Sequence, residues 1–187
     1  MSIVSTIKMT ARQFLELGED PPGVRLELVN GEVAVSPSPL PRHSYTVVRL
    51  TILLGNHIDR YSLGQLYSDV DTIFGEHDVR RPALLFFAKD RLHLIGEKAM
   101  EGPPDLCVEV LSPSSGTIDR QDKFEQYHRG GVAHYWIVDP KAKIVEGFEL
   151  VDDNKYEPTG RARDGETMHL PPFPDLAIPL GVLWKPE

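Results

Sequence analysis

The stretch from Asp105 to Pro140 constrains the fold most, because a strand pattern, a helix pattern and a second strand pattern follow one another there. The segment "DLCVEVLS" is apolar enough for a half-buried or buried strand, and "HYWIVDP" is typical of a core strand that ends at a turn. Between them, "TIDRQDKFEQYHRGG" is typical of a charged helix and ends at two glycines, a common C-cap signal. These segments predict a sheet with a helix packed against it.

The other segments predict further helices and strands around that sheet. Thr10 is a candidate N-cap for a short helix, and Asn30-Gly31 between two alternating segments is a strong hairpin signal. Residues 43–61 have the pattern of a long amphipathic helix. Strands are expected at residues 64–74, 80–92, 143–150, 165–170 and 176–184. This order predicts a mixed α/β fold, here an α+β sheet with helices on it.

We expect a single domain, because no Gly/Ser-rich linker or repeat divides the 187 residues. The domain spans residues 1–187, with an N-terminal helix (1–20) and C-terminal strands (165–187) as extensions. No stretch approaches the roughly 20 apolar residues of a membrane-spanning helix, and the N-terminal residues lack a secretory signal pattern. The sequence therefore predicts a soluble protein without a membrane partner.

Charge and cysteine content limit the class of protein. The net charge of −8 and the pI of about 5.4 argue against a protein that coats nucleic acid through bulk charge. They leave open an enzyme that reaches nucleic acid through a local groove and metal ions. Cys107 is the only cysteine, so no intrachain disulfide forms, which fits a cytoplasmic location. Its place in an apolar strand predicts a core residue rather than a reactive thiol.

Two acids lie four residues apart on the first predicted strand. Asp105 and Glu109 point to the same face, but at about 3.3 Å per residue they are roughly 13 Å apart, too far to share one metal ion. Asp105 is best explained as a strand-start or turn residue. Glu109 lies among apolar neighbours, where a carboxylate is costly unless it is paired or metal-bound. A metal ligand at Glu109 therefore needs a partner acid from a neighbouring strand.

Lys123 on the following helix has two explanations. Its spacing favours a surface lysine paired with Asp119 four residues earlier, and leaves open a role in a site beside Glu109. Tyr127 and Phe124 are expected on the buried face of the helix. The serines at 112, 114 and 115 fit a turn and a helix cap, because no G-x-S-x-G nucleophile elbow surrounds them.

Three segments carry a resemblance to a known family. The residues "LELVNGEVAVSPSPLPRH", "VRRPALLFF" and "PPDLCVEVLSPSS…DRQDKFEQYHRGGVAHYWIVDP" together resemble the Uma-type family of bacterial restriction-endonuclease-like proteins, a former domain of unknown function. That family belongs to the PD-(D/E)XK nuclease superfamily. The resemblance covers roughly residues 27–150. It implies a restriction-endonuclease-like fold, with a central mixed β-sheet flanked by helices.

The resemblance also implies a set of site residues. The family's site has an early Glu, an Asp on a central strand, a Glu on the adjacent strand and a Lys. The two glutamates fall on Glu27 and Glu109, and the lysine, supplied by the following helix in this family, falls on Lys123. The expected Asp position is Ala83, so a metal-binding carboxylate is missing.

These residues take roles from the family's phosphodiester chemistry. Glu109 is expected to be a ligand of Mg²⁺ or Mn²⁺, Lys123 an electrostatic stabiliser and Glu27 an outer acid. With Ala83 in the vacated ligand position, metal binding is expected to be weak. His43 and Asp71 are candidates for the edge of the site, but His43, at the start of the long helix, fits a capping or packing role better. Asp71 can partly replace the missing acid if it faces the same side of a neighbouring strand.

Two functions remain open. The first is a Mg²⁺-dependent endonuclease that hydrolyses DNA phosphodiesters as a homodimer, weak or inactive because of Ala83. The second is a catalytically dead nuclease-fold module for binding or dimerisation. A small-molecule hydrolase has only the serine-rich turn to support it. The first function requires the side chains of Glu109 and Lys123 to converge on one face of the sheet.

Overall fold

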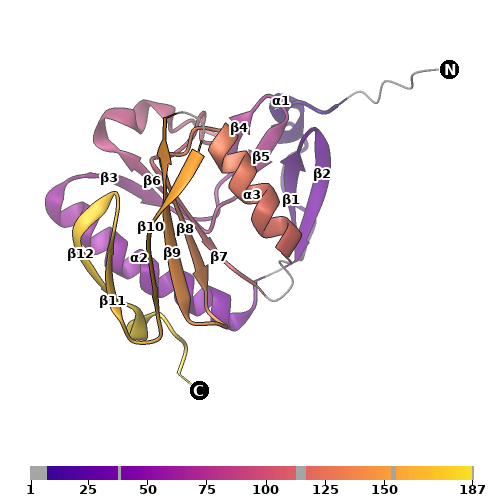
Figure 1. The fold of residues 1–187 in the computed structure, drawn as a ribbon. Coiled ribbons are helices and arrows are strands. Elements are labelled where there is room, and N and C mark those ends of the chain that lie inside the picture. The colour runs from indigo at the N-terminus through magenta and orange to yellow at the C-terminus, as the bar shows by residue number, and fades with distance from the viewer. Residues whose placement is uncertain (1–7, 38, 113–116, 153–154, 187) are drawn as a thin grey trace.

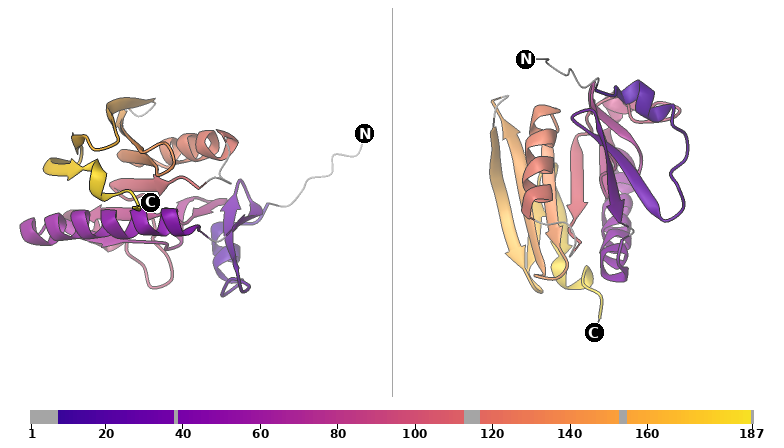
Figure 2. Two further views of the ribbon diagram at one scale, coloured as in Figure 1. Left: turned by 90° about the horizontal axis from the view of Figure 1, so that it is seen from below. Right: turned by 90° about the vertical axis from the view of Figure 1, so that its right-hand side faces the viewer.

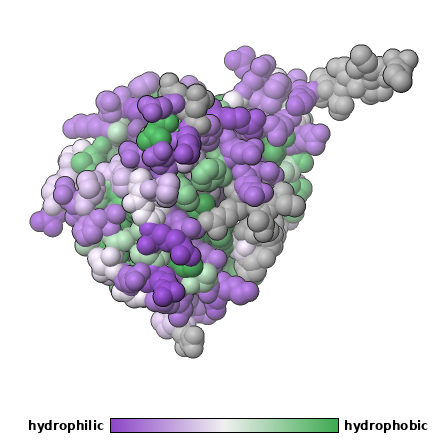
Figure 3. Space-filling model, viewed as in Figure 1, coloured by the Kyte–Doolittle hydropathy of each residue, from purple (hydrophilic) through white to green (hydrophobic). Residues whose placement is uncertain are grey.

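A six-stranded sheet forms the centre of the molecule in the computed structural model, which describes residues 8–37, 39–112, 117–152 and 155–186. One face of the sheet is covered by helix α3 (Thr117–Arg129) and the other by helix α2 (Pro41–Tyr61) with a C-terminal hairpin, as Figures 1 and 2 show. The face seen in Figure 3 is mostly hydrophilic, with hydrophobic residues in small groups. The predicted mixed sheet flanked by helices is confirmed.

The central sheet is mixed, with the strand order β10-β9-β8-β7-β6-β3. Its neighbours are antiparallel except β7 and β8, which run parallel and are joined by α3 on one face of the sheet. Parallel neighbours need such a crossover because a tight turn cannot return the chain to the same end. The strands are β3 (Gly64–Tyr67), β6 (Leu84–Ala88), β7 (Leu106–Val110), β8 (His134–Asp139), β9 (Ile144–Val151) and β10 (Lys155–Arg163).

A second sheet with the order β2-β1-β5-β4 lies beside the first (Figure 1). Its hairpin turns at Asn30 and Gly31, with φ of 50° and 82°, the left-handed backbone that an Asn-Gly turn adopts readily. Thr10 caps helix α1 (Ala11–Leu15) in a capping box with Gln13. The strands are β1 (Val24–Val29), β2 (Glu32–Pro37), β4 (Thr72–Gly75) and β5 (Asp78–Arg80).

Helix α2 and the C-terminal hairpin share one hydrophobic core. Leu50, Leu54 and Ile58 follow helical spacing and are buried against that face of the central sheet. The hairpin, β11 (Thr167–Leu170) and β12 (Phe173–Pro179), packs into the same core and is followed by a 3₁₀ turn at Leu180–Val182. Within the described residues, no helix is both long and apolar enough to cross a bilayer.

Three strand predictions were wrong in extent. The strand expected at 176–184 is β12 (Phe173–Pro179), and a 3₁₀ turn follows it at Leu180–Val182. The expected strand at 64–74 is two strands in different sheets, because the chain turns between them through Asp69, which has a positive φ of 57°. The expected strand at 80–92 begins only at Leu84 and gives way after Ala88 to a 3₁₀ helix (Lys89–Leu94). Strands β5 and β10 were not predicted; β5 has three residues, and β10 contains Pro158 and a register shift at Pro158/Gly160.

Candidate active site

Glu109 and Lys123 meet on the α3 face of the central sheet. Alternation along β7 turns Leu106, Val108 and Val110 into the α2 core and leaves Glu109 on the opposite face. There the Lys123 Nζ–Glu109 Oε2 distance is 3.2 Å, and the lysine side chain is 16% exposed. Lys123 is thus mostly buried and paired with the strand carboxylate, which meets the condition set for a nuclease-type site. The side chain of Asp119 lies outside the described residues.

Tyr127 completes the surroundings of Glu109. Its hydroxyl donates to Glu109 Oε1 over 2.5 Å, and the tyrosine is fully buried. Tyr127 follows Lys123 by four residues, so both side chains project from the same face of α3 toward β7. The sequence predicted burial of Tyr127 but not this hydrogen bond; the i, i+4 spacing from Lys123 was the signal available.

Burial raises the pKa of Glu109 above its ordinary value of 4.5. The positive charge of Lys123 and the Tyr127 hydrogen bond lower the pKa in part, whereas the negative charge of Glu27 adds to the rise. Both Glu109 oxygens are therefore engaged by protein groups, and the carboxyl holds a proton more readily than an exposed glutamate.

Glu27 lies on β1 and is held by two donors from residues 80 and 81. Arg80 Nη1 donates to Glu27 Oε2 and the backbone N–H of Arg81 donates to Glu27 Oε1, each over 3.0 Å. Burial alone would raise the pKa of Glu27, but Lys123, Arg80 and the Arg81 N–H together bring the pKa below its ordinary value. Glu27 is a buried, ionised partner of Arg80, and the charge of Lys123 acts on both glutamates.

Arg80 joins Glu27 to helix α3 through Gln126. Arg80 Nε donates to Gln126 Oε1 over 2.5 Å, and Gln126 Nε2 donates to Asp78 Oδ1 over 2.5 Å. Arg80 and Gln126 are 4% and 3% exposed, so this network is almost completely buried. The sequence did not predict either residue as part of the site, because their roles depend on the packing of α3 against β5.

Ala83 directly precedes β6 and is buried in the core. The β6–β7 ladder ends at the pair Leu84–Val108, and Ala83, one residue before it, packs in the hydrophobic core on the α2 side of the sheet, whereas Glu109 faces α3. The alanine methyl offers no ligand oxygen at that position. Its role as a vacated metal-ligand position stays a prediction.

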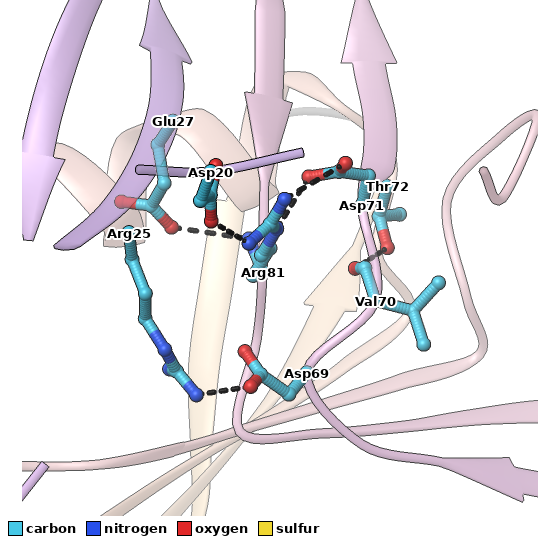
Figure 4. A network of polar contacts seen from close by, with 8 residues as sticks. All are labelled: Asp20, Arg25, Glu27, Asp69, Val70, Asp71, Thr72 and Arg81. Carbon is cyan, nitrogen blue, oxygen red and sulfur yellow. Dashed lines mark hydrogen bonds and ion pairs between the residues drawn. The ribbon is translucent and has the colours of Figure 1, made fainter. Parts of the chain in front are cut away.

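Asp71 does not lie on a strand, so the condition for it to replace the missing acid is not met. It precedes β4, and its carboxylate receives Arg81 Nε and Nη2 at 2.6 and 3.1 Å. Figure 4 shows Arg81 between Asp71 and Asp20, which also accepts from the guanidinium. These acids hold Arg81 in place, and the two hydrogen bonds to Asp71 raise the pKa of that guanidinium.

His43 lies at the start of α2, next to the carboxyl end of β7. Its ring hydrogen-bonds with the backbone of Val110. Burial lowers the pKa of His43 below its ordinary value, and the positive charges of Arg25 and Lys123 lower it further. The charge of Lys123 therefore acts on His43 as well as on Glu109. The role of His43 at the edge of the site stays a prediction.

Two other residues have the structural roles that the sequence predicted. Asp105 accepts the backbone N–H of Ala88 over 2.7 Å and pairs with Arg91 at 2.9 Å at the entrance of β7. Cys107 is fully buried in the core. The serines at 114 and 115 lie outside the described residues.

The described side chains do not fit a tight Mg²⁺ site. Mg²⁺ prefers carboxylate and water oxygens in octahedral geometry. Among the described residues, no group of three or more His, Cys, Asp or Glu side chains could hold a metal ion. Glu109 is engaged by Lys123 and Tyr127, and Glu27 by Arg80.

Comparison with known proteins places the chain in a family. The model of the Uma2 family, described as "putative restriction endonuclease", matches residues 11–181. The chain belongs to the Uma2 family. A solved structure titled as a putative nuclease belonging to DUF820, from Anabaena variabilis ATCC 29413, superposes with a TM-score of 0.76. It shares 19% identity over 94% of this chain and 97% of that chain, a level at which the likeness shows the fold.

Among curated proteins, no sequence matches this chain significantly. The family and the fold confirm the predicted resemblance and support a nuclease-like role.

Proposed function

We propose that this Uma2 member is a DNA-binding protein with an attenuated phosphodiester hydrolysis site at Glu109 and Lys123. The observation that carries the proposal is the mostly buried Lys123–Glu109 contact of 3.2 Å, which joins the two residues expected from the family resemblance. A lysine there can stabilise negative charge that develops on a phosphate. Ala83 leaves Glu109 without its partner acid, so we expect binding of Mg²⁺ or Mn²⁺ to be weak and cleavage slow.

Plasmid nicking tests this proposal. Supercoiled DNA is incubated in Mn²⁺ or Mg²⁺ with the parent protein and with Ala83→Asp, Ala83→Asn and Ala83→Asp/Lys123→Ala. The asparagine variant matches the aspartate in volume and lacks the charge. We expect Ala83→Asp to nick at least about a hundredfold faster than the parent and Ala83→Asn, since removing one electrostatic element of an active site typically costs about 10²–10³ in rate. Lys123→Ala should abolish that gain.

The outcomes separate the proposed function from its alternative. If Ala83→Asp is folded and binds DNA but does not nick, the hydrolytic origin of the site is refuted. The protein is then a nuclease-fold binding or dimerisation module. The binding-module alternative is supported by the contacts of Glu109, because both of its carboxyl oxygens already have protein partners rather than a place for a metal ion. If the parent nicks as fast as Ala83→Asp, attenuation is refuted.

A homodimer is part of the proposal, because two sites are needed to address both strands of a duplex. Sedimentation equilibrium at micromolar concentration, with and without a 20-base-pair duplex, measures the assembly. A mass near 42 kDa for the free protein, twice the 21.0 kDa of one chain, is expected. A mass of one chain under both conditions contradicts the dimer.

A further inference from the structure

A basic cavity lies next to the candidate site, at the carboxyl ends of the parallel strands β7 and β8. It has a volume of about 630 Å³ and is bounded by the start of α2, the residues after β7, the β8–β9 turn and the C-terminal segment. These segments meet at the edge of the molecule where the chain ends (Figure 1). Ligand pockets for small molecules typically have about 300–1,000 Å³, so one nucleotide fits.

The charge of this cavity is opposite to that of the whole chain. Arg42, Lys141 and Lys185 line it, whereas Asp139 is the one acid among its described lining residues. Asp139 Oδ1 accepts the backbone N–H groups of Lys141 and Ala142, so its carboxylate is committed to the turn. A local excess of cations on a chain of net charge −8 favours an anion at this place.

The cavity also shares a wall with the candidate site. Leu111 and Ser112 line it and follow Glu109 by two and three residues, roughly 7–10 Å at 3.3 Å per residue. His43 lines it too, hydrogen-bonds with the Val110 backbone, and has a buried Nδ1 with no hydrogen-bond partner in the described part of the chain. One strand of DNA advances about 3.4 Å per nucleotide, so this separation corresponds to two or three nucleotides.

We propose that this cavity binds a phosphate of a nucleic-acid strand two or three nucleotides from the phosphate addressed by Glu109 and Lys123. Arg42, Lys141 and Lys185 supply the countercharge, and the cavity sets the register of the strand on the site. This inference rests on the proposed function, because it takes the neighbouring site as the place where a phosphodiester lies.

Binding of fluorescently labelled single-stranded and duplex 20-mers, followed by anisotropy in EDTA at several KCl concentrations, tests the cavity without cleavage. The test variant is Arg42→Gln/Lys141→Gln, and the control is Lys155→Gln. Lys155 is 74% exposed and lies beside Val151 at the end of β9, whereas the cavity lies at the start of β9. We expect at least a tenfold weaker affinity for the test variant and less than a twofold change for the control.

The salt dependence adds a second readout. Each lost phosphate contact lowers the slope of log affinity against log salt by about 0.7–0.9, so the test variant should show a slope smaller by about 1–2. If Arg42→Gln/Lys141→Gln weakens binding no more than Lys155→Gln does, the cavity is not a phosphate site for nucleic acid and the inference is overturned. Retained nicking by Ala83→Asp would then leave the proposed function standing.

Competition distinguishes a strand phosphate from a free one. Inorganic phosphate and dAMP, each at up to 20 mM and constant ionic strength, are titrated into the protein–DNA complex. Displacement by dAMP in the parent protein, and its loss in the test variant, supports the inference. The opposite result is that inorganic phosphate binds in a way that depends on Lys141 while the affinity for DNA does not. That result would show that the cavity binds free phosphate and would overturn its assignment to nucleic acid.

Discussion

Tyr127→Phe tests the hydrogen bond that holds the buried carboxylate of Glu109. The Oη–Oε1 distance is 2.5 Å, and the two residues are 0% and 6% exposed. A hydrogen bond to a charged group contributes about 1.5–3 kcal/mol, against about 0.5–1.5 kcal/mol for a neutral pair. We expect Tyr127→Phe to lower the free energy of unfolding by about 1.5–3 kcal/mol at pH 8. For a chain of this size, that loss lowers Tm by about 3–12 °C.

The loss should be smaller at pH 5, and the sign follows from the raised pKa of Glu109. The folded carboxyl keeps its proton over a pH range in which the unfolded carboxyl is already ionised. The stability due to that proton is fully present below the ordinary pKa of 4.5 and is lost as the pH rises through the folded pKa. Tyr127→Phe removes a donor that favours the carboxylate, so it raises the folded pKa further and deepens the loss at pH 8.

Urea unfolding followed by tryptophan fluorescence measures this effect at pH 5, 6.5 and 8. Tyr127→Phe is compared in the parent and in a Glu109→Gln background, where the side chain cannot ionise. There the substitution should cost about 0.5–1.5 kcal/mol, independent of pH as far as this pair is concerned. Equal losses at pH 5 and pH 8 in the parent background would refute the reasoning, because they would show that Tyr127 does not face an ionising carboxyl.

Three other outcomes are expected. Arg80→Met should lower the free energy of unfolding by about 3–5 kcal/mol, because it leaves the buried Glu27 without its ion pair, and adding Glu27→Gln should recover part of the loss in urea unfolding. Leu54→Ala removes a fully buried side chain under the central sheet and should cost about 2–5 kcal/mol in the same assay. MgCl₂ at 10 mM is about ten times below the Kd expected of a weak site, so it should raise Tm by less than about 1 °C at constant ionic strength. A rise of 5 °C, measured by calorimetry, would contradict the absence of a three-ligand metal site among the described residues.

Elements with strong local signals could be predicted from the sequence. The Asn30-Gly31 turn needs a left-handed backbone that these residues adopt readily, and its hairpin is present. Helix α2 carries its buried residues at helical spacing over 21 residues, so the periodicity of the sequence was enough to predict it. Strand β7 is apolar except for Glu109, and the predicted segment 105–112 contains the observed strand Leu106–Val110.

Elements and contacts that depend on tertiary structure were missed. Strand β5 has three residues and is fixed by pairing with β1 and β4, which no local pattern encodes. The partner of Lys123 could not be chosen from spacing, because Asp119 and Glu109 both fit the sequence and only packing of α3 on β7 decides. The same packing determines that the Tyr127 hydroxyl reaches Glu109 and that Arg80 reaches Glu27.

The charges around the candidate site explain how the fold tolerates the missing acid. Glu27 pairs with Arg80 and Glu109 with Lys123, so each of these buried carboxyl groups has a cationic partner without a metal. An aspartate at position 83 would make this buried group net negative, and a buried unpaired charge is costly. Ala83→Asp should therefore have a lower Tm than Ala83→Asn in EDTA, and Mn²⁺ should raise the Tm of the aspartate variant alone. Ala83→Asp thus supplies a metal ligand and also makes the stability of the protein depend on a bound cation. With alanine at this position, the charged side chains of the site already have partners of opposite sign.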